Sequence, residues 1–102
     1  MALTSNNGER ISPSPLDVRV LVALLKRPLN AYRVARQVED DFGPGFKASN
    51  GTIYPSLKRL ASLGFITKLD DGNYKTTLLG REVLGWELAR LKRLMELAQD
   101  RS

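Results

Sequence analysis

Residues 49–64, SNGTIYPSLKRLASLG, constrain the fold of this chain more than any other segment, because they carry both a helix start and a helix stop. Ser49 can accept a bond from a free N–H in a first helical turn, and Gly64 readily takes the left-handed conformation that ends a helix. Pro55 has no N–H to donate, so it is expected near the helix start. The segment predicts one helix that begins at Ser49 or, one turn later, at Thr52.

The two sides of this predicted helix differ in chemistry. Apolar residues recur at the spacing of a buried stripe, at Ile53, Leu57, Leu60 and Ala61. The opposite side has no acid and carries Gly51, Thr52, Pro55, Lys58, Arg59 and Ser62. Such a helix is either a solvated surface helix or one that faces a polyanion, and the neighbouring segments favour the second interpretation.

Two helices are predicted before this segment. Ser14-Pro15-Leu16-Asp17 resembles a capping box with proline in the first turn, and the helix that it starts ends at Lys26-Arg27-Pro28. This first helix is apolar nearly all round and therefore needs cover on more than one side. The second helix runs from its cap Asn30 to Gly43, with a predicted buried stripe of Ala31, Val34, Ala35, Val38 and Phe42.

A β-hairpin is predicted after the central helix. Residues 65–69 and 74–78 alternate apolar and polar side chains around Asp70-Asp71-Gly72-Asn73. The order helix, helix, helix, hairpin is that of a winged helix-turn-helix, whose third helix enters the major groove of DNA. The predicted fold class is mainly α with a small β-hairpin (α+β), followed by a C-terminal dimerisation helix.

The register of the hairpin can also be predicted. With a loop of two or four residues, Leu69 opposes Tyr74 and Lys68 opposes Lys75, so that the two lysines face each other on the outside. A phosphate between them would relieve their repulsion, whereas the two acids of the turn would keep the tip away from DNA. The predicted core face of the hairpin consists of Phe65, Leu69, Tyr74 and Leu78.

A long amphipathic helix is predicted from Leu78, after the cap Thr77, towards Gln99. Its apolar residues step by four and three, as in a coiled-coil seam, and no later segment is available to cover them, so a homodimer is expected. The predicted dimerisation residues on this helix and on the first helix are Leu16, Val20, Leu84, Leu88, Leu91, Met95 and Ala98. Trp86 is either an anchor of that interface or the contact of a planar aromatic ligand.

Composition narrows the function further. The 102 residues suffice for one domain, and 16 Lys and Arg against 11 Asp and Glu give a net charge of +5, which favours polyanionic partners. Histidine and cysteine are absent, which removes the commonest metal ligands and general base. We therefore expect no enzymatic activity, metal or cofactor. The sequence has no apolar run of membrane-spanning length, so no membrane association and a cytoplasmic location are expected.

With these motifs placed, the sequence resembles the PadR family of transcriptional regulators. The matching segments, with the family patterns PLHGY, SxGTxYPxLxRL, GLI and YxLTxxGRE, are Pro28–Tyr32, Ser49–Leu60, Gly64–Ile66 and Tyr74–Glu82. Asn30 and Ala31 replace the family's His-Gly, and Thr76 replaces an apolar residue. The resemblance implies a homodimeric winged helix that represses promoters and is released in some members by a small aromatic or drug-like effector. The single C-terminal helix resembles the short-tailed members.

These inferences define a predicted interface with double-stranded DNA and three segments of the chain. Ser49 starts the recognition helix, and the residues expected near base edges are Asn50, Thr52, Pro55 and Ser56. The residues expected at phosphates are Tyr54, Lys58, Arg59, Lys68 and Lys75. The segments are a tail over 1–13, a winged helix-turn-helix over 14–78 and a dimerisation helix over 79–102. The alternative is a winged-helix module that docks proteins without binding DNA.

Overall fold

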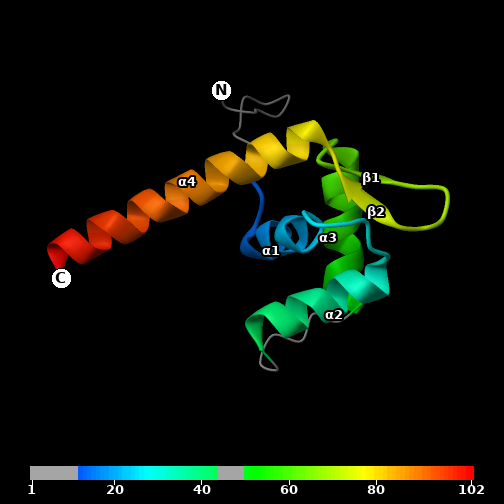
Figure 1. The fold of residues 1–102 in the computed structure, drawn as a ribbon, viewed down its shortest axis with the longest axis horizontal. Coiled ribbons are helices and arrows are strands. Elements are labelled where there is room, and N and C mark those ends of the chain that lie inside the picture. Colours follow the sequence, from blue (N-terminus) through cyan, green and yellow to red (C-terminus); the bar gives the residue numbers. More distant parts are fainter. Residues whose placement is uncertain (1–11, 44–49) are drawn as a thin grey trace.

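A computed structural model describes residues 12–43 and 50–102, which form helices and one antiparallel hairpin (Figure 1). The elements are α1 (Pro15–Ala23), α2 (Ala31–Phe42), α3 (Asn50–Ser62), β1 (Ile66–Lys68), β2 (Tyr74–Thr76) and α4 (Leu78–Arg101). This order confirms the predicted fold class, mainly α with a small hairpin. Most of the predicted tail over 1–13, and the predicted role of Ser49, lie outside the described residues.

Local capping chemistry explains where α1 and α2 begin. The Asp17 N–H donates to Ser14 Oγ (3.1 Å) and the Ser14 N–H donates to Asp17 Oδ2 (2.9 Å), which completes the predicted capping box of α1. Asn30 Oδ1 accepts the Arg33 N–H (2.9 Å) and caps α2. The sequence predictions of both starts are confirmed.

Helix α3 ends at the predicted glycine. Gly64 has φ of 81°, its N–H donates to the Ala61 carbonyl (3.1 Å), and the Phe65 N–H donates to the Leu60 carbonyl (2.9 Å). This pair of bonds is a Schellman motif, which satisfies carbonyls that the helix end would leave unpaired. The observed start at Asn50 agrees with the earlier of the two predicted starts, and Pro55 lies inside the helix, further from its start than predicted.

The hydrophobic core lies where α1 meets the other helices. Helix α1 contacts α2, α3 and α4, and the predicted α3 stripe of Ile53, Leu57 and Leu60 is fully buried against it. Phe42 was predicted to be buried but is an exposed residue at the end of α2, where the Arg19 guanidinium lies 4.9 Å from its ring centroid. The end of α2 extends past the core, which explains the difference.

The predicted hairpin register is wrong by one residue. The observed pairs are Ile66 with Thr76, Thr67 with Lys75 and Lys68 with Tyr74. The Leu69 N–H donates to the Asn73 carbonyl (2.7 Å) and the Gly72 N–H to the Leu69 carbonyl (3.0 Å). The loop therefore has three residues, with Gly72 in the left-handed region at φ 86°. A three-residue loop of this kind shifts the pairing by one position relative to loops of two or four residues.

Two consequences follow from the observed register. Lys68 shares a hairpin face with Tyr74, with its Nζ 5.8 Å from the ring centroid, while Lys75 lies on the opposite face. The two lysines therefore do not oppose each other, and the predicted phosphate between them is not supported. Leu78 is exposed rather than part of the core face, because it is the first residue of α4 and no longer belongs to the strand.

Helix α4 has a buried beginning and an exposed remainder. Thr77 Oγ1 accepts the Gly80 N–H (3.0 Å), as predicted for a cap, and Gly80 packs so closely that a Cβ there would lie 2.0 Å from the Phe65 carbonyl oxygen. Val83 and Leu84 are buried, and towards its C-terminus the helix extends away from α1, α2 and α3 (Figure 1). The helix continues without a break through the predicted segment boundary at residue 79.

Candidate nucleic-acid interface

The exposed side of α3 carries hydroxyl, aromatic and cationic groups. We call Thr52, Tyr54, Pro55, Lys58 and Arg59 the α3 face; all are exposed, and Tyr54 has 51% of its surface accessible. Helix α3 has no acid between residues 50 and 62. The side chain of Asn50, predicted to approach base edges, lies outside the part of the chain that the structure describes.

Ser56 does not belong to the α3 face. Its side chain is buried, and its Oγ donates to Asp17 Oδ1 of α1 at 2.6 Å. Because Ser56 lies three residues after Ile53, it points to the same side of the helix as that core residue. The prediction that Ser56 approaches a base edge is therefore corrected: its hydroxyl is used inside the subunit.

Arg59 is exposed on one side and paired on the other. Its Nε donates to Asp17 Oδ2 (3.2 Å) and its Nη2 to Asp17 Oδ1 (2.5 Å), while half of its side chain, 51%, remains accessible. Burial alone would raise the pKa of the Asp17 carboxyl, but hydrogen bonds from Ser56, Ser14 and Arg59 outweigh burial and hold that pKa below its ordinary value. Asp17 is therefore an anion, and it balances the charge of Arg59.

A hollow of about 310 Å³ opens between α2, α3 and the hairpin, beside the α3 face. Its lining includes all three tyrosines of the chain and one lysine; the full set is Asn30, Ala31, Tyr32, Tyr54, Lys68, Gly72 and Tyr74. Tyr32 is 66% exposed, and sequence reasoning missed it as a candidate. The available signal was its place in Pro28–Tyr32, beside the cap of α2. The hollow joins a phenol of α2 and a lysine of β1 to the α3 face.

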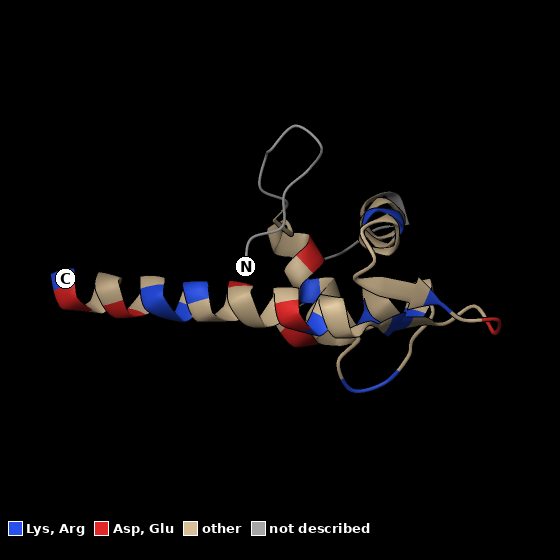
Figure 2. Cartoon of the chain, turned by 90° about the horizontal axis from the view of Figure 1, so that it is seen from above, with Lys and Arg blue, Asp and Glu red and all other residues tan. Residues whose placement is uncertain are grey.

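The charges of the hairpin are divided between its tip and its strands. Figure 2 shows acids, in red, at the far end of the hairpin and cations, in blue, on the strands behind them. Asp70 and Asp71 are exposed, and Asp71 Oδ1 accepts the Asn73 N–H (3.0 Å), so that one of these acids stabilises the turn. Phosphate attraction is expected at the strands and not at the tip.

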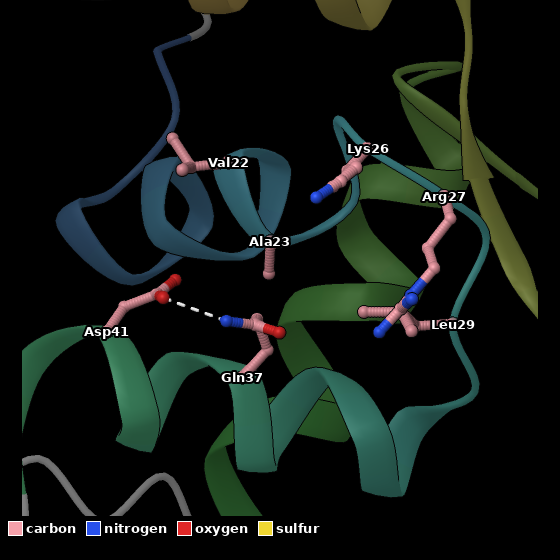
Figure 3. Close-up of a pocket in the computed structure, with 7 residues that line it drawn as sticks. All are labelled: Val22, Ala23, Lys26, Arg27, Leu29, Gln37 and Asp41. Carbon is pink, nitrogen blue, oxygen red and sulfur yellow. Dashed lines mark hydrogen bonds between the residues drawn. The ribbon is translucent and has the colours of Figure 1, made fainter.

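A second hollow lies between α1 and α2 and has a different lining (Figure 3). It measures about 330 Å³, and the lining residues are Val22, Ala23, Lys26, Arg27, Leu29, Gln37 and Asp41. Gln37 Nε2 donates to Asp41 Oδ1 at 2.8 Å across one wall. None of the residues predicted to contact DNA, a second copy or an effector lines this hollow, so it is separate from the candidate interface.

The predicted dimerisation residues divide into two groups. Val20 and Leu84 are buried in the subunit's own core and are not available to a second copy, and Leu16 is half-buried against the same core. Further along α4 the apolar residues are exposed. We call Leu88, Leu91, Leu94 and Met95 the α4 stripe, and Ala98 continues it.

Trp86 is exposed over 40% of its surface. It precedes Leu91 by five residues, which is about 140° around the helix, so it lies towards the opposite side of α4 from the α4 stripe.

Two other kinds of site are not found in the described chain. Among residues 12–43 and 50–102, no group of three Asp, Glu, His or Cys side chains is arranged to hold a metal ion. No helix of the described chain is both long and apolar enough to span a membrane.

Comparisons with known proteins agree with this geometry. Residues 20–85 match the model of the family described as "Transcriptional regulator PadR-like family". The "Negative transcriptional regulator PadR" of Bacillus subtilis (strain 168) is 30% identical over 93 residues, which cover 83% of this chain and 51% of that protein. The chain thus spans about half the length of this relative.

Solved structures share the fold. A PadR family transcription regulator from Clostridium difficile R20291 has a TM-score of 0.73 at 21% identity, over 85% of this chain and 97% of that one. A PadR-like transcription factor from Bacteroides fragilis has a TM-score of 0.70 at 24% identity, over 85% and 89%. At these identities the likeness is one of fold.

Proposed function

Because this chain belongs to the PadR-like family of transcriptional regulators, we propose that it binds double-stranded DNA as a homodimer and represses transcription from an inverted-repeat operator. The α3 face is the observation that carries this proposal. It combines exposed hydroxyl, phenol and cationic groups on a helix without an acid, and it stands beside one cation of the hairpin, Lys68. That is the chemistry of a helix that lies in a major groove between two phosphate backbones.

The residues of the interface have different proposed roles. Thr52 and Pro55, with Asn50, lie in the first half of α3 and are proposed to approach base edges. Lys58 is proposed to neutralise a phosphate, since no acid of the described chain pairs with it. The other proposed phosphate contacts are Tyr32, Tyr54, Arg59, Lys68 and Lys75.

The proposed dimer rests on the α4 stripe. Leu91 and Met95 expose 43% and 63% of their surfaces on a helix that leaves the core after Leu84. A row of large apolar residues at this spacing is best covered by the same row of a second copy. Such a pair would carry two α3 faces, which would enter successive major grooves about 34 Å apart.

Repression and release are the finer parts of the proposal. The Bacillus subtilis relative is named as a negative regulator, which supports repression here, although the match covers 51% of that protein. Trp86 is proposed as the contact for a small aromatic effector, because its large aromatic side chain is exposed on α4, two residues after the buried Leu84. A ligand at Trp86 would act by changing how the two α3 faces are spaced.

Fluorescence anisotropy with a random-sequence duplex tests the DNA proposal. If Lys58, Lys68 and Lys75 each neutralise one phosphate per subunit, the logarithm of the dimer's binding constant falls against the logarithm of salt concentration with a slope of roughly −5. Binding that is absent, or that does not respond to salt, would contradict the DNA proposal and favour the alternative, a winged-helix module that docks proteins. A duplex selected by the protein from a random pool then measures its sequence preference.

A further inference from the structure

Asp17 is the one charged residue that is buried among residues 12–43 and 50–102, with 1% of its surface exposed. It belongs to α1, yet most of its partners are on α3. An ionised carboxylate is costly to bury unless it is paired and fully hydrogen-bonded. Asp17 lies beneath the α3 face, so we ask what its hydrogen bonds to α3 contribute there.

Both carboxylate oxygens of Asp17 receive two donors. Oδ2 accepts the Ser14 N–H (2.9 Å) and Arg59 Nε (3.2 Å). Oδ1 accepts Ser56 Oγ (2.6 Å) and Arg59 Nη2 (2.5 Å). The capping box of α1 uses Oδ2 alone. All donors to Oδ1 come from α3, 39 and 42 residues further along the chain, so capping does not account for half of this carboxylate.

The pairing limits what Arg59 can offer to DNA. A guanidinium has five N–H donors in a planar fork. Nε and Nη2 point to Asp17, and Nη2 also lies 3.5 Å from Ser14 Oγ. Within the described residues, Nη1 donates to none of these oxygens. Arg59 thus presents one fixed edge, and the adjacent carboxylate cancels much of its attraction for distant phosphates.

Resting on the proposed function, we propose that Asp17 is a positioning residue for DNA recognition. Through Oδ1 it fixes the rotation of α3 against α1 and holds the Arg59 fork, so that Arg59 adds directional contact with little indiscriminate charge. The neighbouring residue, Lys58, supplies the positive charge that attracts phosphates, since no acid of the described chain pairs with it. Asp17 therefore lowers affinity for arbitrary DNA and raises the ratio of selected to random binding.

The test compares Asp17→Asn with the wild-type full chain, using the random duplex and a duplex selected from a random pool by the wild type. Freed from the carboxylate, Arg59 should raise random-duplex affinity roughly five- to tenfold at low salt and steepen the salt slope by about one per subunit. The ratio of selected to random affinity should fall by a similar factor. In an Arg59→Gln background, Asp17→Asn should change neither the random-duplex affinity nor the salt slope, because both effects act through the Arg59 guanidinium; a change in either would contradict the inference.

An Asp17→Asn protein that is folded by circular dichroism and keeps the wild-type salt slope and affinity ratio would overturn the inference alone. Wild-type protein that binds neither duplex would overturn the proposed function itself. If Asp17→Asn does not fold, Arg59→Lys replaces it, because an ammonium keeps the charge but cannot form the two-point pair. Loss of selectivity with random-duplex affinity retained supports the inference, and unchanged selectivity contradicts it.

Discussion

The α3 face and the α4 stripe are both exposed, but they differ in every other respect. The α3 face is polar and cationic, and it is anchored from below by Ile53, Leu57 and the Asp17 pair. The α4 stripe is apolar, and its large side chains are exposed on a helix whose last fully buried residue is Leu84. Exposure alone therefore says little about a partner. The chemistry and the support beneath each surface indicate a polyanion for one and a second copy for the other.

The largest expected effect comes from placing a charge in the α4 stripe. Leu91→Asp should weaken dimerisation at least about a hundredfold, because two carboxylates would be buried opposite each other at a two-fold interface. Binding to a selected duplex should fall with it, while the subunit stays folded. Sedimentation velocity measures the dimer. Ala89→Asp, on the far side of α4, is the control, and equal dimerisation of the two variants would remove the α4 stripe from the interface.

The next largest effect is expected at the start of α4, where the helix packs against the rest of the subunit. Gly80→Ala should lower the free energy of unfolding by about 1–3 kcal/mol, because its Cβ would lie 2.0 Å from the Phe65 carbonyl oxygen and backbone must shift. Gly85→Ala meets nothing within 4 Å and should stabilise the helix by about 0.5–1 kcal/mol. Urea denaturation measures both. Equal changes in the free energy of unfolding for the two variants would mean that α4 is not packed against Phe65 as described.

On the α3 face, neighbouring residues should behave differently. Lys58→Ala should weaken random and selected duplexes alike, by roughly tenfold, and make the salt slope about two units shallower for the dimer. Thr52→Ala should instead change the ratio of the two affinities. Anisotropy titrations over a range of salt concentrations check both. The reverse pattern would exchange the proposed phosphate and base contacts.

The smallest expected effect is the acid dependence of stability. The pKa of Asp17 lies below the ordinary value of 3.8, so its carboxylate stabilises the folded chain above that value, and this contribution is lost as pH falls through the folded pKa. The free energy of unfolding of Asp17→Asn should therefore fall less steeply with acid than that of the wild type. Urea denaturation at stepped pH checks this, with Asp40→Asn as a control that removes an exposed carboxylate. If the free energy of unfolding falls equally steeply with acid in Asp17→Asn and in the wild type, the pairing of Asp17 is contradicted.

Local chemistry explains why much of the fold could be predicted from the sequence. Ser14, Asn30 and Thr77 cap helices through residues three positions away, and Gly64 ends one within its own turn. The α3 core stripe follows from helical spacing in the same way. Each of these predictions depends on a few consecutive residues.

The errors arise where one distant contact or one backbone angle decides the result. The hairpin register depends on Gly72 adopting a left-handed conformation, which adds a third residue to the loop. Ser56 was predicted to face DNA from its helical position alone. The carboxylate that its hydroxyl contacts instead, Asp17, is 39 residues away in the sequence, so no local pattern indicates the pairing. Val20 and Leu84 share apolar spacing with interface residues, and only the packing of α1 against α4 assigns them to the core.

Hydroxyl-radical footprinting of a selected duplex tests the central claim most directly, since it reports whether two α3 faces contact one DNA molecule together. The account predicts two protected regions on the same side of the duplex, with centres about 10 base pairs apart, and the loss of both regions in Leu91→Asp. A single protected region, or protection that survives in a monomeric Leu91→Asp protein, would contradict it.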